Sequence, residues 1–336
     1  MKAIRKAVLL GTVSGLLAAT PAWASDAPAD DAAPQEGEII VTAQRRGESL
    51  NQVPMAVQAV TGETLKDLRV TDVRDLTAVA PSFTVSQSYQ GVPTYTLRGI
   101  GFNTINLSAT STVGTYVDEV AYAYPIMNTG PMFDLERVEV LKGANALIFG
   151  RGGGGGVINR VSKAPEFGQL KGSVSGGVDT LGAWSAALDL GAPLADGIGL
   201  RFNTTYEAFN NHRQDYEGHF FGVTPTLGAR LGDATTATLT YEYVDDRRLT
   251  DRGVPSRGGL PLTGYDETLF GSPTTNHSEV TAHLVHGRID HEFSGSVSAN
   301  LSVQYAHYDK FYSNVFPNAA VNTVTNTVLL SGYNSG

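Results

Sequence analysis

The 336-residue sequence predicts two architectures in succession, an α+β domain and then the antiparallel strands of a transmembrane β-barrel. Three observations lead to this fold class. Short helical and extended segments are mixed between residues 47 and 165. Residues 166–336 instead alternate between apolar and polar side chains with a period of two. The connections between these alternating segments switch between tight turns and long loops, an asymmetry typical of outer-membrane barrels.

The first 24 residues have the pattern of a secretory signal peptide. Their start is positively charged, an apolar run from Ala7 to Ala19 follows, and Ala22-Trp23-Ala24 supplies a small-x-small cleavage site. This apolar run is shorter than the roughly 20 residues of a spanning helix, which argues against a transmembrane anchor. Residues 25–36 are rich in Ala, Pro and Asp without periodicity, and we expect a disordered linker there.

The composition excludes several classes of protein. No cysteine is present, so the chain has no disulfide framework, thiolate metal site or catalytic thiol. The net charge of −9 and the absence of a dense Lys/Arg cluster argue against nucleic-acid binding. Charged residues make up 17%, and 38 residues are glycine. Low charge with abundant glycine and aromatic residues favours a β-rich envelope protein.

Residues 37–46, GEIIVTAQRR, form the most informative short segment. Four β-branched residues, Ile39 to Thr42, favour an extended backbone. Because no nearby segment offers it a core, we expect an isolated strand on a tether. Such a strand suits capture by another protein through strand addition, which indicates a protein that is docked or pulled and not an enzyme.

Residues 47–165 are predicted to form one compact α+β domain. Two short helices are expected after the N-capping residues Thr61 and Thr71, the second ending before Pro81. Short strands are expected at Phe83–Val85, Tyr95–Leu97, Gly114–Val120, Val138–Leu141 and Val157–Val161. The run Gly150 to Gly156 lacks the ending of a phosphate-binding loop and leads into a strand, so we interpret it as a tight turn or a close backbone contact.

The alternating segments of residues 166–336 predict barrel strands in preference to a soluble β-sandwich. The expected strands of about 10–14 residues exceed the usual length of 5–6. About seven strands and the start of an eighth fit, and the alternation continues over Val321 to Leu330. Because lipid-facing strands cannot leave a bare edge in a bilayer, we expect this chain to be part of a longer protein.

No catalytic or metal-binding constellation is apparent, and we predict no cofactor. His283 and His286 are three residues apart on an expected strand, so they point to opposite faces. The pair Asp245-Asp246 lacks the alternating ligand spacing of a calcium loop. A Gly-x-Ser-x-Gly nucleophile motif is also missing from the sequence.

Three segments carry a family resemblance: EIIVTAQRR at 38–46, TLRGIG at 96–101 and LERVEVLKGANALIFGRGGGGGVINRVSKAP at 135–165. Their order and spacing resemble the N-terminal part of a TonB-dependent outer-membrane receptor. The resemblance implies a TonB box at 37–46, a plug domain at 47–165 and, at 166–336, the first part of a barrel of about 22 strands.

The resemblance implies energised uptake across the bacterial outer membrane, with TonB and its inner-membrane energising complex as partners. The run from Gly150 to Pro165 and a long loop containing Asp251 to Ser256 are most similar to ferric-siderophore receptors. Vitamin B12 or a carbohydrate as ligand remains open, as does a non-energised porin or adhesin barrel surrounded by outer-membrane lipid. The sequence does not decide which chelate is bound or whether the protein forms oligomers.

The resemblance also implies roles for individual residues. The TonB-binding residues are expected to be Glu38, Ile39, Ile40, Val41, Thr42 and Ala43. Arg98 and Lys142 are expected to latch the plug to barrel-wall carboxylates, unless they are ordinary surface or internal charges. The ligand-contacting candidates are Tyr89, Tyr122 and Tyr124 on the apical loops at 87–91, 102–112 and 121–128. The alternative for each of these tyrosines is that its side chain packs inside the plug and does not contact a ligand.

Overall fold

The computed structural model describes residues 39–43, 45, 47–87, 93–101, 109, 111–122, 124–128, 132–150, 152–295 and 297–335, without the side chains of 125, 126, 146 and 147. The chain divides into two units, Met1–Gly37 and Glu38–Gly336, and the described residues all belong to the second. The expected signal peptide and linker therefore lie outside the described residues, as do Glu38 and Tyr89. Among the described residues, no helix has the combined length and apolarity needed to cross a membrane.

The first part of the described chain is an α+β domain built on a mixed five-stranded sheet. Its strand order is β3 (Val57–Thr61), β9 (Leu135–Lys142), β10 (Gly156–Ser162), β7 (Val113–Val117) and β8 (Val120–Ala121). β10 is parallel to β7, and the other neighbours are antiparallel. A three-stranded sheet contains β4 (Phe83–Gln87), β5 (Pro93–Leu97) and β6 (Ile100–Gly101). Four of the five expected strands are present with bounds shifted by a few residues. The expected single strand Gly114–Val120 is wrong, because a turn with positive φ at Asp118 and Glu119 divides it into β7 and the antiparallel β8.

In the described part of this domain, five short helical segments accompany these sheets: α1 (Gly62–Asp67), η1 (Val73–Asp75), α2 (Leu76–Val79), η2 (Pro125–Asn128) and α3 (Ala146–Phe149). Thr61 caps α1 as predicted, accepting a hydrogen bond from the Thr64 backbone. The prediction of Thr71 as the second cap is wrong by one residue. Asp72 is the N-cap, because it forms a reciprocal capping box with Asp75.

The domain core lies between the five-stranded sheet, α1, α2 and the three-stranded sheet. Its buried members include Val60, Leu65, Leu76, Phe83, Tyr95, Leu97, Val138 and Ile158. Each strand contributes every second side chain to this core, such as Val138 and Val140 of β9. The helices contribute apolar residues that follow their N-caps, such as Leu65 of α1 and Leu76 of α2. This arrangement explains why capping signals and short β-branched runs alternate in the sequence.

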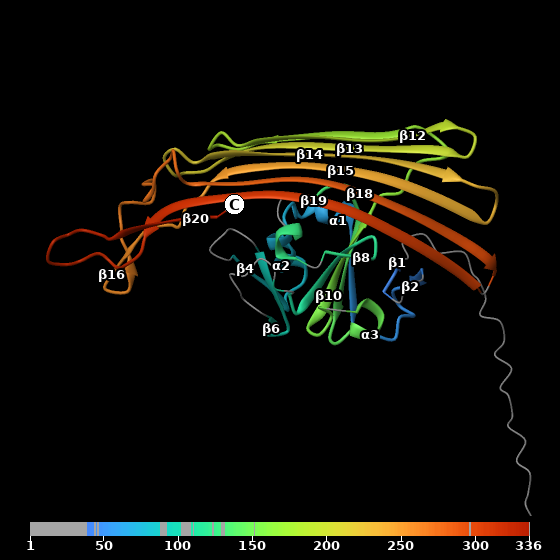
Figure 1. The fold of residues 1–336 in the computed structure, drawn as a ribbon, viewed down its shortest axis with the longest axis horizontal. Coiled ribbons are helices and arrows are strands. Elements are labelled where there is room, and N and C mark those ends of the chain that lie inside the picture. The colour runs from blue at the N-terminus through green and yellow to red at the C-terminus, as the bar shows by residue number, and fades with distance from the viewer. Residues whose placement is uncertain are drawn as a thin grey trace, which may run out of the picture. The chain divides into compact units, whose positions relative to one another are not determined.

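Residues 171–335 form an eight-stranded antiparallel sheet in which neighbours in sequence are neighbours in space (Figure 1). Its strands are β11 (Lys171–Val178), β12 (Trp184–Ala195), β13 (Ile198–Asn210), β14 (Glu217–Arg230), β15 (Thr235–Leu249), β18 (His277–Ser294), β19 (Val297–Pro317) and β20 (Leu330–Ser335). The predicted seven strands and start of an eighth are confirmed. The expected continuation over Val321 to Leu330 is wrong, because Asn322 accepts hydrogen bonds from two backbone amides and makes a turn there.

Away from the apolar patch of Phe220, Val244, Ala282 and Leu284 that packs on the α+β domain, the two faces of this sheet have the inverse of a soluble protein's polarity. Arg201, Asn203 and Thr205 on β13 are buried. Apolar side chains on the opposite face are exposed, for example Leu301 and Val303 at 63% and 64%. A polar inner face and an apolar outer face are typical of transmembrane barrel strands and not of a β-sandwich, whose apolar face is buried.

The connections alternate in length, as the sequence predicts. Tight turns join β12 to β13 and β14 to β15, whereas residues 250–276 separate β15 from β18. This long connection contains the hairpin of β16 (Ser256–Arg257) and β17 (Leu260–Pro261), which lies beyond one end of the long strands (Figure 1).

Candidate functional site

The expected TonB box is docked on the α+β domain. β1 (Ile40–Val41) pairs with β2 (Glu48–Ser49), and the Leu50 amide donates to the Ile39 carbonyl at 2.9 Å. Val41 and Ala43 are 0% exposed in an apolar cluster with Tyr116, Leu141, Phe149 and Val157. The expectation of an isolated strand without a core is therefore wrong, because residues about 75–115 positions later supply that core.

Glu139 of β9 holds Thr42 by both its backbone and its side chain. The Thr42 amide donates to Oε1 of Glu139 at 2.8 Å, and the Thr42 hydroxyl lies 3.2 Å from both carboxylate oxygens. Arg137 Nε donates to Oε1 at 2.8 Å, and Asn159 Nδ2 donates to Oε2 at 3.3 Å. This role of Glu139 was not apparent from the sequence. Its one local signal was a charged residue between the buried Val138 and Val140.

Arg45 adds a further contact between the same segment and the domain. Its Nε donates to the Ile148 carbonyl at 3.2 Å, and its guanidinium lies 5.2 Å from the centre of the Phe149 ring. The short helix α3, which follows Lys142-Gly143 in the sequence, therefore forms part of the surface on which residues 39–45 dock.

The two expected latch residues have different surroundings. Arg98 is exposed in a turn with a positive φ of 52°, and Lys142 is half-buried at the end of β9. Within the described part of the chain, neither side chain forms an ion pair. Their role as a latch remains a prediction.

Two contacts between the domain and the sheet have the polarity opposite to that of the expected latch, with an acid on the domain and an arginine on the sheet. Glu119 pairs with Arg288 of β18 at 3.3 Å. Asp134 lies 4.0 Å from Arg201 of β13 and accepts a hydrogen bond from Asn203. Burial raises the pKa of the Asp134 carboxyl well above its ordinary value, and Arg201 partly offsets that effect.

A third contact, between Lys163 and Asp189 of β12, lies where the chain leaves the domain for the sheet. The Nζ–Oδ2 distance is 2.6 Å, and Asp189 also pairs with Arg201. Lys163, Asp189, Arg201 and Asp134 thus form one connected group of ionisable side chains.

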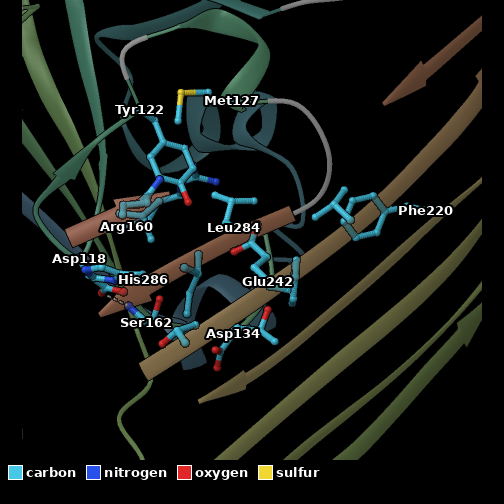
Figure 2. A pocket seen from close by; sticks show the side chains of 17 residues that line it. Asp118, Tyr122, Met127, Asp134, Arg160, Ser162, Phe220, Glu242, Leu284 and His286 are labelled. Carbon is cyan, nitrogen blue, oxygen red and sulfur yellow. Dashed lines mark hydrogen bonds between the residues drawn. The ribbon is translucent and has the colours of Figure 1, made fainter. Parts of the chain in front are cut away.

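A cavity of about 70 Å³ lies between the domain and the sheet. Figure 2 shows Tyr122, Arg160 and Asp118 reaching it from the domain, and Glu242 and His286 from the sheet. Arg160 Nη2 and His286 Nε2 are buried, and neither has a hydrogen-bond partner among the described residues. A polar cavity of this volume has room for a few water molecules that would satisfy these atoms.

The candidate ligand tyrosines have different surroundings. Tyr122 is only 6% exposed and packs with Phe220, Val244 and Leu284. Burial raises the pKa of its phenol, which keeps the hydroxyl protonated. Tyr124 is 49% exposed. The exposed ring of Tyr124 is available to a ligand, whereas Tyr122 packs between the domain and the sheet.

The histidines offer no shared metal site. His283 is exposed and its Nδ1 contacts the Tyr241 hydroxyl at 2.8 Å, whereas His286 faces the cavity. Their opposite orientations are those predicted from a spacing of three on a strand. Across the described residues, no group of three or more His, Asp or Glu side chains is arranged to hold a metal ion.

Residues 49–157 match the family model of the TonB-dependent receptor plug domain. A probable TonB-dependent siderophore receptor, PiuA of Acinetobacter baumannii, is 24% identical over 76% of this chain and 35% of its own length. The catecholate siderophore receptor Fiu of Escherichia coli O157:H7 is 28% identical over 52% of this chain and 23% of its own length. The chain thus spans about a quarter to a third of these relatives.

Solved structures share the fold. The complex of Pseudomonas aeruginosa FpvA with a heterologous pyoverdine and iron superposes with a TM-score of 0.73 and 19% identity, covering 87% of this chain and 39% of that one. The siderophore receptor PiuA from A. baumannii has a TM-score of 0.71 and 23% identity, covering 85% and 41%. Residues 49–157 thus match the plug domain of TonB-dependent receptors, and the chain shares the plug-and-strand fold of these solved receptors.

Proposed function

We propose that this protein imports a ferric siderophore across the bacterial outer membrane, using energy delivered by TonB. The observation that carries the proposal is a plug domain joined to strands with an apolar outer face and a polar inner face, with an extended segment docked on the plug. Such strands suit a bilayer, and the docked segment provides a handle for a periplasmic partner.

TonB is proposed to bind residues 38–43 by strand addition. β1 pairs with β2 along one edge, and its second edge joins no other strand of the described chain. That edge would accept a strand from TonB once the Thr42 amide leaves Glu139, and a pull on it would act on the plug through Val41, Thr42 and Ala43. The inner-membrane proton gradient would supply the work.

The ligand class rests on the relatives. PiuA is a probable siderophore receptor, Fiu is a catecholate siderophore receptor, and FpvA is solved with pyoverdine and iron. We propose a ferric chelate of that kind. Tyr124, with its exposed ring, is the best supported of the three ligand-contacting tyrosines, and the surroundings of Tyr122 favour packing. Roles for Tyr89 and for the Arg98 and Lys142 latch remain part of the proposal.

The remaining parts of the proposal concern export and chain organisation. Residues 1–24 would direct secretion and be removed, and residues 25–36 would tether the TonB box. The plug would occupy residues 47–165, and residues 166–336 would contribute strands to an outer-membrane barrel with lipid on its apolar face.

The substitution Ile40→Pro in the full-length protein tests the proposal. Proline removes a backbone donor from the TonB-binding strand, so uptake of radioactive iron from the chelate should fall to the level of cells without TonB. Binding of the chelate to isolated outer membranes should be unchanged. Ile40→Val is the matched control, because it keeps a β-branched side chain and the donor.

Normal uptake by the Ile40→Pro variant would contradict TonB-driven transport. Uptake that also persists without TonB or the proton gradient would instead indicate a passive barrel. If membranes bind vitamin B12 or a sugar and not the ferric chelate, the transport class stands and the ligand class is wrong.

A further inference from the structure

Two polar side chains in the plug interior face each other beneath the docked segment. Glu139 of β9 and Asn159 of β10 are directly paired in the antiparallel ladder, and both are 0% exposed. Asn159 Nδ2 lies 3.3 Å from Glu139 Oε2 and 3.3 Å from the Thr42 hydroxyl. The two side chains and Thr42 thus form a triangle of hydrogen bonds inside the protein.

A carboxylate without exposure is unfavourable unless donors surround it. Glu139 accepts from Arg137, Asn159 and both donors of Thr42. Hydrogen bonds to a charged acceptor are stronger than neutral ones. Thr42 is 97 residues away in the sequence, so the hydrogen bonds between Glu139 and Thr42 depend entirely on docking of residues 39–43.

Asn159 also connects this triangle to the barrel sheet. Its Oδ1 accepts from the Glu119 backbone amide at 3.4 Å, and the Glu119 carboxylate accepts from Arg288 of β18 at 3.3 Å. Glu119 has a positive φ of 67°, an unfavourable backbone conformation for a non-glycine residue that its neighbours must hold in place. Polar contacts therefore run from β18 through the plug to Thr42.

We infer that Glu139 and Asn159 are a clamp that keeps the TonB-binding strand docked, so that release of this strand requires their hydrogen bonds to Thr42 to break. That this strand binds TonB rests on the proposed function, whereas the clamp itself rests on the hydrogen bonds of Glu139 and Asn159 with Thr42. The hydrogen bonds of the clamp differ from the contacts of the apolar cluster in one respect. Its bonds to Thr42 are directional and break together when the strand shifts, whereas apolar contacts weaken gradually.

Thiol labelling tests the clamp directly, since the 336 residues contain no cysteine. Val41→Cys introduces a buried thiol that reacts with a water-soluble maleimide only when the strand undocks. In outer-membrane fragments without TonB or chelate, this thiol should label about tenfold or more faster when Glu139→Gln is added. Asn159→Ala should accelerate labelling in the same direction. Glu136→Gln, at an exposed position of the same strand β9, should leave the rate unchanged.

A second reporter, Leu65→Cys in the buried face of α1, separates undocking from unfolding of the plug. Glu139→Gln should leave its labelling rate unchanged. Equal acceleration at Leu65 and Val41, or no acceleration at Val41, would overturn the clamp. Because the assay contains no TonB, chelate or gradient, its result is independent of whether the protein transports a siderophore.

Discussion

Glu119 of the plug and Arg288 of β18 form an ion pair across the boundary between plug and sheet, with the Arg288 Nη1 donating to Oε2 at 3.3 Å. Arg288 also contacts Asp290 on its own strand at 2.7 Å. This contact helps to hold the plug against the sheet, because Glu119 is buried and, among the described residues, its carboxylate forms an ion pair with Arg288.

Removal of this pair should destabilise the plug. Arg288→Gln leaves the Glu119 carboxylate buried without its cation, and we expect a loss of about 1–3 kcal/mol in the free energy of plug unfolding. The urea dependence of labelling at Leu65→Cys in outer membranes measures this loss. Arg247→Gln on β15 is the control, because its pair with Asp245 is exposed and should contribute less than about 1 kcal/mol.

A double-mutant cycle with Glu119→Gln isolates the pair. The two substitutions together should cost less than the sum of the single changes, because the second removes the unpaired charge that the first leaves behind. Additive losses would show that Arg288 and Glu119 stabilise the plug independently.

Two glycines of the run Gly150 to Gly156 differ in the space available for a side chain. Gly156 has a φ of 145°, and an added Cβ would lie 2.7 Å from the Leu141 carbonyl oxygen and collide with Leu97. Gly156→Ala should therefore destabilise the plug by about 2–4 kcal/mol. At Gly154, an added Cβ meets no atom within 4 Å. Gly154→Ala should be neutral or slightly stabilising in the same urea assay, and equal losses at both positions would refute this explanation.

The long connection between β15 and β18 is predicted to depend on Arg213. Its Nη1 faces the carbonyl oxygens of Asp266 and Thr268 at 2.8 and 3.2 Å, and its Nε pairs with Asp251. Arg213→Lys keeps the charge and loses the planar arrangement of donors. Chymotrypsin should then cleave at the exposed Tyr265 several-fold faster. The neighbouring, exposed His212→Ala serves as the control, and an unchanged cleavage rate in Arg213→Lys would contradict this role.

The strands and helix ends that depend on neighbouring residues alone were predicted from local patterns in the sequence. The alternation in β13 and β19 identified strands with one polar and one apolar face, and Thr61 marked the start of α1. Where two capping residues compete, as at Thr71 and Asp72, the sequence alone did not decide which one forms the capping box.

The docking of residues 39–43 was beyond sequence reasoning for a different reason. Its partners Tyr116, Glu139 and Phe149 come from three elements that assemble only when the plug sheet forms. No local period links a β-branched strand to a carboxylate 97 residues away. The ion pairs of Glu119 and Asp134 with the sheet were equally hidden, because register between separate sheets determines them.

The Asp134 carboxyl predicts a pH dependence of plug stability. Burial raises its pKa in the folded protein, so the folded state binds this proton more tightly than the unfolded chain. The free energy of unfolding from this group is therefore largest below the ordinary carboxyl pKa of about 4 and falls as the pH rises toward the raised value. Asp134→Asn cannot titrate, so its urea midpoint should lack this fall. The exposed Asp196→Asn should retain it, and an unchanged pH slope in Asp134→Asn would show that Asp134 is already ionised in the folded protein throughout that range.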